Sequence, residues 1–160
     1  MTPTFRERGI RMIRTIAAAA LCLMALTQDA CGADPAQQEA NKRTVRDFYD
    51  KALNQKDFES ASAYLGPASV QHDQNAADGA EGLRAFIRFL RDRYPSSRSE
   101  IKRVFADGDC VILHVHAVRE PGTRGMAIVD IVRLAGGRIG VHWDVHEAII
   151  EKPGNPNGMF

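Results

Sequence analysis

Histidine and carboxylate side chains recur at alternate positions in the C-terminal half of the sequence. His114 and His116 are separated by one residue, and the same spacing joins His142, Asp144 and His146. Successive side chains of a β-strand point to opposite faces, so each set would lie on one face of its strand. Imidazole and carboxylate groups in such a row could move protons, hold a metal ion or bind a polar ligand.

Asp130 stands at the centre of an apolar stretch, Ile128–Val132. An ionised carboxylate in that position is costly to bury unless it is paired or faces a cavity. Two interpretations follow. In one, Asp130 pairs with a neighbouring arginine and the polar strand faces are simply solvated. In the other, apolar surroundings raise the pKa of the carboxyl group, which then works as an acid or a base.

A metal site is an alternative use of the histidines. His114, His116 and Glu120 have the spacing of the first half of a known two-part metal motif, and His142 or His146 could add a ligand. The second half of that motif is missing from the sequence. Alternating histidines also arise on any strand with one polar face. We therefore expect no metal.

Other chemistries lack their motifs in this sequence. There is no Gly-x-Ser-x-Gly motif, and Cys110 lies in an apolar run that indicates a core residue rather than a nucleophile. Gly136-Gly137 predicts a hairpin turn, and no glycine-rich phosphate-binding loop is present. We expect no cofactor.

The composition is that of an ordinary globular protein. The chain has 160 residues and a formal net charge of +1, with 44% hydrophobic and 26% charged residues. This length can form one domain with a sizeable core. The balanced charge argues against a general nucleic-acid-binding protein, which would be basic. Three cysteines are too few for the disulfide scaffold of a small secreted domain.

The first 33 residues have the layout of a secretory signal peptide. An apolar run over 16–26 follows a basic start and precedes the small residues of 30–33. The arginines of the basic start are Arg6, Arg8, Arg11 and Arg14. The apolar run is shorter than the roughly 20 residues that a membrane-spanning helix needs. We expect cleavage after Ala33, a periplasmic or secreted protein, and no membrane attachment after cleavage. A lipid anchor on Cys31 is the alternative.

Three helices are predicted between the leader and the strands. The first lies within 35–54, where apolar residues at helical spacing form one stripe: Val45, Phe48, Tyr49, Ala52 and Leu53. Asp57 predicts the N-cap of a second helix that runs through Leu65 and ends at Gly66-Pro67. An extended piece over 69–72 and a polar loop follow. A third helix then begins behind Asp78 and ends before Pro95.

The period of the apolar residues changes to two after the third helix. Strands are predicted over 101–105, 109–119, 126–134 and 138–150, with Asp107-Gly108 as a hairpin turn. Helices followed by hairpin-linked strands indicate an α+β domain over residues 34–160 with a curved antiparallel sheet. Three amphipathic helices can cover only one face of that sheet.

Several short segments resemble the SnoaL-like polyketide cyclase family of the nuclear transport factor 2-like superfamily. They occur in the order typical of that family and cover essentially the whole of 34–160. They are Val70-Gln71-His72, Ala77-Asp78-Gly79, Glu81-Gly82-Leu83, Val129–Arg133, Gly137-Arg138-Ile139, His142–Val145 and Asn155–Phe160. The resemblance implies a cone-shaped α+β barrel with three N-terminal helices packed on a curved sheet, enclosing one pocket, commonly as a homodimer.

The resemblance also implies roles for particular residues. In ketosteroid isomerases of this superfamily, a tyrosine of the first helix and a strand aspartate stabilise an enolate oxygen. An acid after the second helix moves the proton. Tyr49 and Asp130 match the first two positions, and His72 falls near the third. SnoaL-like cyclases similarly rely on a strand aspartate for a metal-free aldol closure, and Asp130 is the best match.

We therefore expect Asp130, His72 and Tyr49 to be catalytic, with Asp130 as the main acid and base. The expected substrate-binding residues are His114, His116, His142, Trp143, Asp144 and His146. The ligand would be a small, largely apolar carbonyl compound that undergoes aldol closure or isomerisation. A non-catalytic ligand-binding module with the same pocket is the alternative, because one fold can serve several functions.

Overall fold

The computed structural model describes residues 34–160, which begin with a long helix, α2 (Pro35–Tyr49). The side chain of Asp34 caps this helix by accepting a hydrogen bond from the backbone N–H of Ala36 at 2.9 Å. Val45 and Tyr49, four residues apart on one face of α2, are buried. The predicted leader, 1–33, lies outside the described residues, so its cleavage and export stay predictions.

The other helices follow the predicted order with one difference. The first helix continues as a π-helical segment, η2 (Asp50–Asn54), and the second, α3 (Phe58–Ser62), starts directly after its predicted N-cap. The prediction that the second helix runs through Leu65 is wrong, because Leu65 already pairs with Ile139 in the sheet. The third helix is α4 (Gly79–Arg93), as predicted.

Five strands form one sheet in the order β1-β5-β4-β3-β2. The strands are β1 (Leu65–Gln71), β2 (Arg98–Asp107), β3 (Cys110–Val118), β4 (Met126–Ala135) and β5 (Arg138–Ala148). From β2 to β5 each strand pairs antiparallel with the next, as predicted, whereas β1 adds parallel to β5 at the edge. The extended piece predicted over 69–72 is therefore part of a fifth strand, and the sheet is mixed at this edge.

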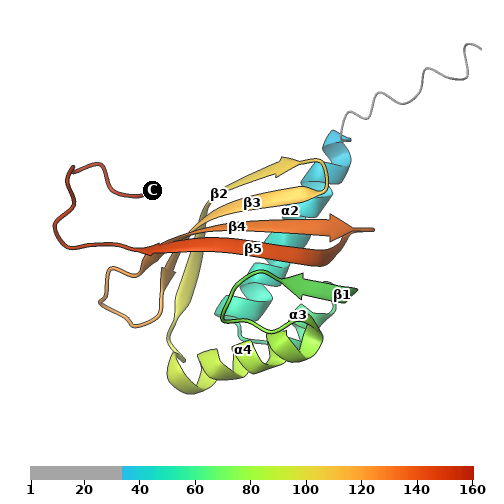
Figure 1. Ribbon diagram of the computed structural model, residues 1–160, viewed down its shortest axis with the longest axis horizontal. Helices are drawn as coiled ribbons and strands as arrows, with labels where there is room; N and C mark the ends of the chain where they lie inside the picture. The colour runs from blue at the N-terminus through green and yellow to red at the C-terminus, as the bar shows by residue number, and fades with distance from the viewer. Residues whose placement is uncertain (1–33) are drawn as a thin grey trace, which may run out of the picture. The chain divides into compact units, whose positions relative to one another are not determined.

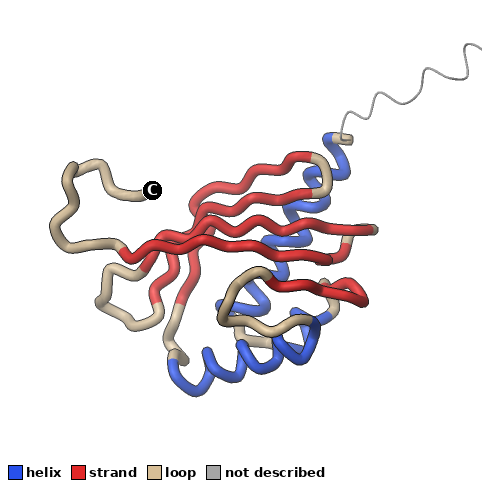
Figure 2. The backbone as a smooth tube through the Cα atoms, viewed as in Figure 1, coloured by secondary structure: helices blue, strands red, loops and turns tan. Residues whose placement is uncertain are grey.

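The face of the sheet that packs against α2, here called the inner face, carries the core (Figures 1 and 2). Alternate residues of β3 are fully buried there: Val111, Leu113 and Val115. Val45 and Tyr49 of α2 belong to the same cluster, and α4 contacts β1 at the edge. Helices on one face of a curled, mostly antiparallel sheet form the predicted α+β cone. The fold class is confirmed.

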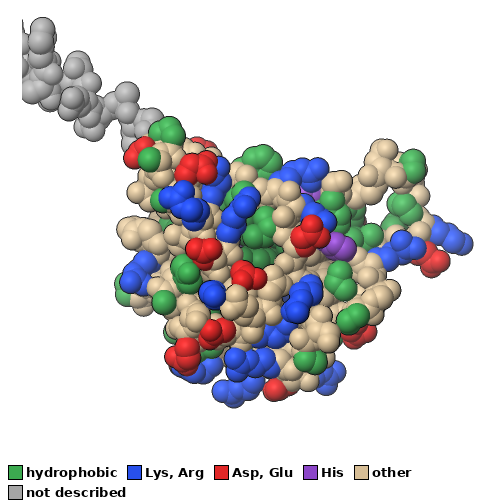
Figure 3. Space-filling view, turned by 180° about the vertical axis from the view of Figure 1, so that it is seen from behind, with side chains coloured by type: hydrophobic (Ala, Val, Ile, Leu, Met, Phe, Trp, Pro, Cys, Tyr) green, Lys and Arg blue, Asp and Glu red, His purple; other side chains and the backbone are tan. Residues whose placement is uncertain are grey.

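The surface carries charges of both signs. Figure 3 shows acidic and basic side chains interspersed over one side of the molecule, with Lys and Arg gathered along the lower edge, at the level where α4 lies in Figure 1. Among residues 34–160, no helix is both long enough and apolar enough to cross a membrane.

Candidate functional site on the inner face of the sheet

Asp130 lies in the middle of β4, with its side chain on the inner face and only 4% of the residue exposed. The hydroxyl of Tyr49 donates a hydrogen bond to Oδ2 of Asp130 at 3.1 Å. Nε2 of His142 lies 2.9 Å from Oδ1. Asp130 is thus buried and paired. The interpretation that it pairs with an arginine is wrong, since its partners are Tyr49 and His142.

Two elements bring partners to this carboxylate, and a third contacts one of these partners. Tyr49 is the last residue of α2, and its side chain reaches the sheet from the helix layer. His142 of β5 is the register partner of Val132, which lies two residues after Asp130 on β4. The side chain of His142 is therefore on the inner face, next to Asp130. Gln71 ends β1 beside His142, and its Oε1 lies 2.7 Å from Nδ1 of His142.

Sequence reasoning did not identify Gln71 as part of this site. Its position depends on the parallel pairing of β1 with β5, in which Gln71 is the register partner of His142. The only signal in the sequence is the short extended piece before the polar loop, and an isolated strand does not reveal its partner. Sequence reasoning also placed His142 only among the substrate-binding residues, although its side chain contacts Asp130 directly.

The electrostatics of His142 favour its protonated form. Burial lowers the pKa of His142, but the hydrogen bond and the negative charge of Asp130 outweigh burial and raise the pKa above its ordinary value. The charges of Asp144 and Asp73 act in the same direction. Both ring nitrogens also face oxygen atoms that can accept hydrogen bonds, which suits an imidazolium ion.

The Tyr49 hydroxyl keeps its proton over the physiological pH range. Burial, followed by the charge and hydrogen bond of Asp130, raises the pKa of Tyr49 well above its ordinary value. Tyr49 is therefore a permanent donor at a buried position. A protonated hydroxyl, a carboxylate and an imidazolium that meet in the protein interior are a set of groups able to hold and move a proton.

Asp144 and His146 extend this group toward solvent. Asp144 lies opposite Asp130 on β5, and burial followed by the charge of Asp73 raises the pKa of Asp144. Nδ1 of His146 lies 3.6 Å from Oδ2 of Asp144, and the His146 side chain is half-exposed. The strand register places the side chains of His142, Asp144 and His146 on the inner face with Asp130, as alternation predicts. Their roles in binding stay predictions.

His72 is not brought to Asp130. Its ring stacks on Trp143, with 5.0 Å between ring centroids and an interplanar angle of 6°. Trp143 alternates with His142 along β5, so it faces the opposite side of the sheet, here called the outer face. His72 and Trp143 therefore lie on the opposite face from Asp130, and their predicted roles in catalysis and substrate binding stay predictions. The reason is that Gln71 takes the inward position at the end of β1, which turns the next side chain outward.

His114 and His116 also lie on the outer face. Their β3 neighbours Leu113 and Val115 fill the inward positions. Nδ1 of His114 lies 3.0 Å from Nη1 of Arg103, and both histidine rings contact Phe160 at centroid distances of 5.1 and 4.9 Å. His114 and His116 therefore lie on the opposite face from Asp130, and their role in substrate binding stays a prediction. The sequence showed that the two share a face, but not which face is inside.

His114, His116 and Glu120 have the spacing of a metal motif in the sequence. Within the described range 34–160, no group of three or more His, Cys, Asp or Glu side chains is placed to hold a metal ion. Nε2 of His116 is 2.8 Å from the backbone carbonyl of Arg124, and Glu120 lies in the loop beyond β3.

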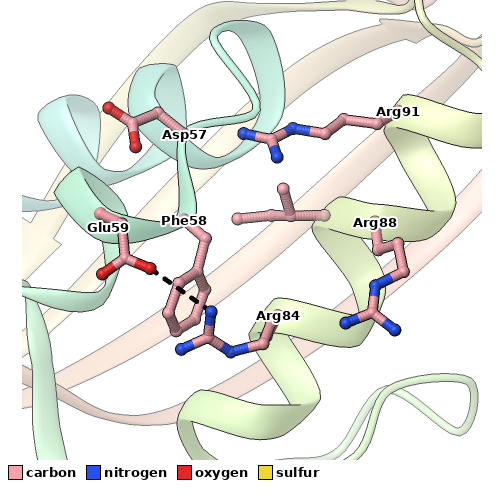
Figure 4. Close-up of a pocket in the computed structure, with 7 residues that line it drawn as sticks. Asp57, Phe58, Glu59, Arg84, Arg88 and Arg91 are labelled. Carbon is pink, nitrogen blue, oxygen red and sulfur yellow. Dashed lines mark hydrogen bonds and ion pairs between the residues drawn. The ribbon is translucent and has the colours of Figure 1, made fainter.

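Two cavities lie elsewhere on the molecule. One, of about 180 Å³, lies between α3 and α4. Figure 4 shows its charged walls, where Arg84 pairs with Glu59 at 3.3 Å and its guanidinium lies 3.7 Å from the centroid of the Phe58 ring. The other, of about 420 Å³, lies where β3 ends and β4 begins, and Arg119 lines it. Asp130 lines neither of them.

Comparison with known proteins agrees with this architecture. The family model of the SnoaL-like domain matches residues 45–142. A provisionally assigned polyketide cyclase from Acidithiobacillus ferrooxidans has 18% identity and a TM-score of 0.57, with 68% of this chain and 88% of that chain covered. TsrD from Streptomyces laurentii has 17% identity and a TM-score of 0.58, with coverages of 69% and 90%.

A provisionally assigned ketosteroid isomerase from Kribbella flavida has 17% identity and a TM-score of 0.56, with coverages of 74% and 85%. At these identities the solved structures establish the fold alone. None of the curated proteins compared with this sequence matches it. Because the matching family model spans more than half of the 160 residues, this chain belongs to the SnoaL-like family.

Proposed function

We propose that this protein binds a small carbonyl compound over the inner face of its sheet and catalyses metal-free proton transfer at the carbon next to the carbonyl. Aldol-type ring closure or isomerisation would follow. Membership of the SnoaL-like family supports small-molecule binding or a cyclase or isomerase role. The observation that carries the proposal is the buried Asp130 carboxylate held between the Tyr49 hydroxyl and His142.

In the proposed reaction Asp130 is the acid and base. Its carboxylate takes a proton from the carbon next to the carbonyl, which leaves an enolate. In isomerisation the same proton returns to another carbon. In aldol closure the enolate carbon attacks a second carbonyl of the same molecule, and Asp130 returns the proton to the alkoxide oxygen. Every atom and electron pair is accounted for without a co-reactant.

Tyr49 and His142 have supporting roles in this proposal. Tyr49 shifts its hydrogen bond from Asp130 to the ligand oxygen as negative charge develops there, which is the main stabilising interaction available to an enolate. His142 balances the carboxylate charge and fixes its orientation, as the imidazolium character favoured by its surroundings allows. His72, which the sequence assigned to proton transfer, has no part because it stacks on Trp143.

Deuterium uptake observed by NMR tests the proposal. A panel of small ketones and β-keto esters is incubated in D2O with residues 34–160, and with the variants Asp130→Asn and Tyr49→Phe. Asp144→Asn is the matched control, since it removes a neighbouring carboxylate from the same face. Exchange that Asp130→Asn reduces by about 10²-fold or more supports the proposal. Exchange that survives Asp130→Asn contradicts it.

The alternative is a non-catalytic ligand-binding module, and one observation favours it. Each carboxylate oxygen of Asp130 already has a hydrogen-bond partner, and no buried polar side-chain atom is left without one among the described residues. A satisfied polar group of this kind can serve to position a core. Ligand binding without exchange across the whole panel would favour this second function.

Export stays part of the proposal. The basic start, apolar run and small residues of 1–33 support removal of a signal peptide after Ala33. N-terminal sequencing of the protein recovered from the periplasm or medium tests this: a first residue of Asp34 supports export with cleavage, whereas a lipidated Cys31 supports the anchored alternative. An intact leader on cytoplasmic protein contradicts both.

We also propose that the protein forms a homodimer through the outer face of the sheet. Phe105, Val129, Ile131 and Val145 are exposed there; the strand register places Val129 beside Val145, and Ile112 between Phe105 and Ile131. A contiguous exposed apolar patch is typical of an interaction surface. Analytical ultracentrifugation should find a dimer for the native chain and a monomer for Val145→Glu. A native monomer at high concentration would contradict the proposal.

A further inference from the structure

Three cationic side chains lie near one another: Lys56 just before α3, Arg98 at the start of β2 and Arg119 just after β3. Lys56 is 5% exposed, and its Nζ donates to the backbone carbonyl of Ser97 at 3.1 Å. Nη1 of Arg98 approaches the same carbonyl at 3.4 Å and donates to the carbonyl of Asn54 at 3.2 Å. Lys56 and Arg98 thus share an acceptor, and that acceptor carries no net charge.

Arg119 is the third cation. It follows Leu113, Val115 and Ala117 at alternate positions, which continues the inner face beyond the end of β3. Its guanidinium lies over the rings of Phe86 and Tyr94, with 5.5 and 5.8 Å from the guanidinium carbon to the ring centroids. Aromatic faces hold a guanidinium in place while leaving its N–H groups available.

None of the three cations forms an ion pair with a carboxylate within residues 34–160. Their mutual repulsion is visible at Lys56, whose pKa is lowered by burial and then by the charges of Arg98 and Arg119. Positive charges that lie close together without a counterion raise the electrostatic free energy of the folded protein, and a bound anion would lower it.

A cavity of about 420 Å³ opens beside Arg119. Tyr94, Met126 and Ile149 supply apolar surface to its walls, and Met126 also packs against the core cluster that contains Tyr49. The carboxylates of the cavity, Glu120 and Glu151, are exposed and pair with none of the three cations. Arg124 also lines the cavity, which therefore offers a ligand two guanidinium groups and apolar surface beside two exposed carboxylates.

The positive charge of Arg119 interacts with the proposed reaction site. It lowers the pKa of Tyr49, although burial and Asp130 raise that pKa overall. The two are nonetheless separated along the sheet. Leu113 pairs with Asp130, and Arg119 lies six residues farther along the chain, just beyond the end of β3, so the backbones of Arg119 and Asp130 are well separated although the Arg119 charge acts on Tyr49. A ligand that reaches both must be elongated.

We propose that Arg119, in the positive field of Lys56 and Arg98, binds a carboxylate of the ligand, so that the substrate is an elongated keto acid with its carbonyl at Tyr49. This inference rests on the proposed function, because it takes the ligand carbonyl to the inner-face site. It changes the expected ligand from a largely apolar compound to an anionic one. A carboxylate accepts two parallel N–H bonds from a guanidinium, which gives both affinity and orientation.

The test compares an unbranched eight-carbon keto acid, whose ketone lies next to the terminal methyl group, with its methyl ester. Isothermal titration calorimetry measures both with residues 34–160. We expect the acid to bind about tenfold or more tightly than the ester, and Arg119→Gln to abolish that preference. Arg119→Lys should restore part of it. Arg103→Gln, an arginine on the outer face bonded to His114, is the matched control and should keep the preference.

Equal affinity for acid and ester, a preference that survives Arg119→Gln, or no binding of either compound at millimolar concentration would overturn the inference. Deuterium uptake by the same two compounds separates this result from the fate of the proposed function. Binding of the acid through Arg119 without exchange would support the anion site and contradict the chemistry. Exchange that depends on Asp130 but is equal for acid and ester would support the proposed chemistry and contradict the anion site.

Discussion

The two faces of the sheet carry histidines in very different settings. On the inner face, His142 is part-buried between the carboxylate of Asp130 and the side-chain oxygen of Gln71. On the outer face, His114 and His116 contact an arginine, a backbone carbonyl and the ring of Phe160. All three come from strands with the same alternating pattern. The direction of the side chain therefore decides whether a histidine pairs with a buried carboxylate or with groups on the outer face.

This contrast shows how the fold decides the chemistry of a side chain. Imidazole is the same group on both faces, but only on the inner face does a buried carboxylate lie 2.9 Å from it. Low polarity strengthens that pairing, while solvent on the outer face weakens the corresponding contacts. Substitutions at matched positions on the two faces should therefore differ in their effects.

The largest expected difference in stability concerns removal of a side chain from each face. Asp130→Ala leaves the Tyr49 hydroxyl and His142 without their buried partner, so we expect the free energy of unfolding to fall by about 2–4 kcal/mol. His116→Ala removes one contact at the surface and should cost about 1 kcal/mol or less. Urea unfolding followed by circular dichroism measures both. Equal costs would show that the inner group does not stabilise the fold.

The second prediction concerns pH. The pKa of His142 is raised in the folded state, so its contribution to stability is fully present below the unfolded histidine pKa of about 6.5. That contribution is lost as the pH rises through the raised folded pKa. Urea unfolding at a series of pH values should show this loss in the native chain. In Asp130→Asn the loss should shrink, and NMR should find a lowered pKa for His142.

Asp144 provides the internal comparison for this pH dependence. Its pKa is also raised in the folded state, so its contribution is present below the unfolded aspartate pKa of about 3.9 and is lost as the pH rises above it. The Asp144 window begins at a lower pH than the His142 window. An unchanged loss near neutral pH in Asp130→Asn would contradict the pairing of Asp130 with His142.

A smaller effect is expected when only one hydrogen bond is removed. Tyr49→Phe keeps the buried ring but deletes the donor to Asp130, and we expect a loss of about 1 kcal/mol in unfolding free energy. Tyr64→Phe is the matched control, because Tyr64 also packs against the core but its hydroxyl makes no hydrogen bond within residues 34–160. Thermal unfolding of both variants makes the comparison. A similar loss in the control would assign the effect to general packing.

The smallest effect should come from the outer face. Phe160→Ala removes a ring at the exposed end of the chain, and we expect a change of about 0.5 kcal/mol or less in unfolding free energy. The ring signals of His114 and His116 in NMR spectra should nevertheless move, because each ring contacts Phe160. The signals of His142 should stay in place. A shift at His142 would mean that the two faces are coupled.

Much of the fold could be predicted from the sequence because it depends on local patterns. Helical spacing of Val45 and Tyr49 identified α2, and a period of two identified β3 to β5. The strand β1 was recognised only in part. It contains Gly66 and Pro67, which indicate a turn, yet Gly66 lies against β5 where an added Cβ would be 3.2 Å from the carbonyl oxygen of Ile139. Such an approach depends on a partner distant in the sequence.

The candidate site was predicted to the extent that alternation and resemblance allow. Asp130 and Tyr49 were identified as a pair, and the structure joins them by a hydrogen bond. The histidines were assigned without knowledge of the faces, so His72 and His114 were placed with Asp130 and His142 was not recognised as its direct partner. Alternation states which residues share a face. Only the packing of α2 against the sheet decides which face is buried.

The rate of deuterium uptake next to a ketone, compared between one variant on each face, tests directly whether the inner face carries the reaction. We expect Asp130→Asn to slow uptake by about 10²-fold or more. The double variant His114→Ala, His116→Ala should exchange at the native rate, since both rings lie on the outer face. Native uptake in Asp130→Asn, or lost uptake in a correctly folded double histidine variant, would show that the inner face does not carry the reaction.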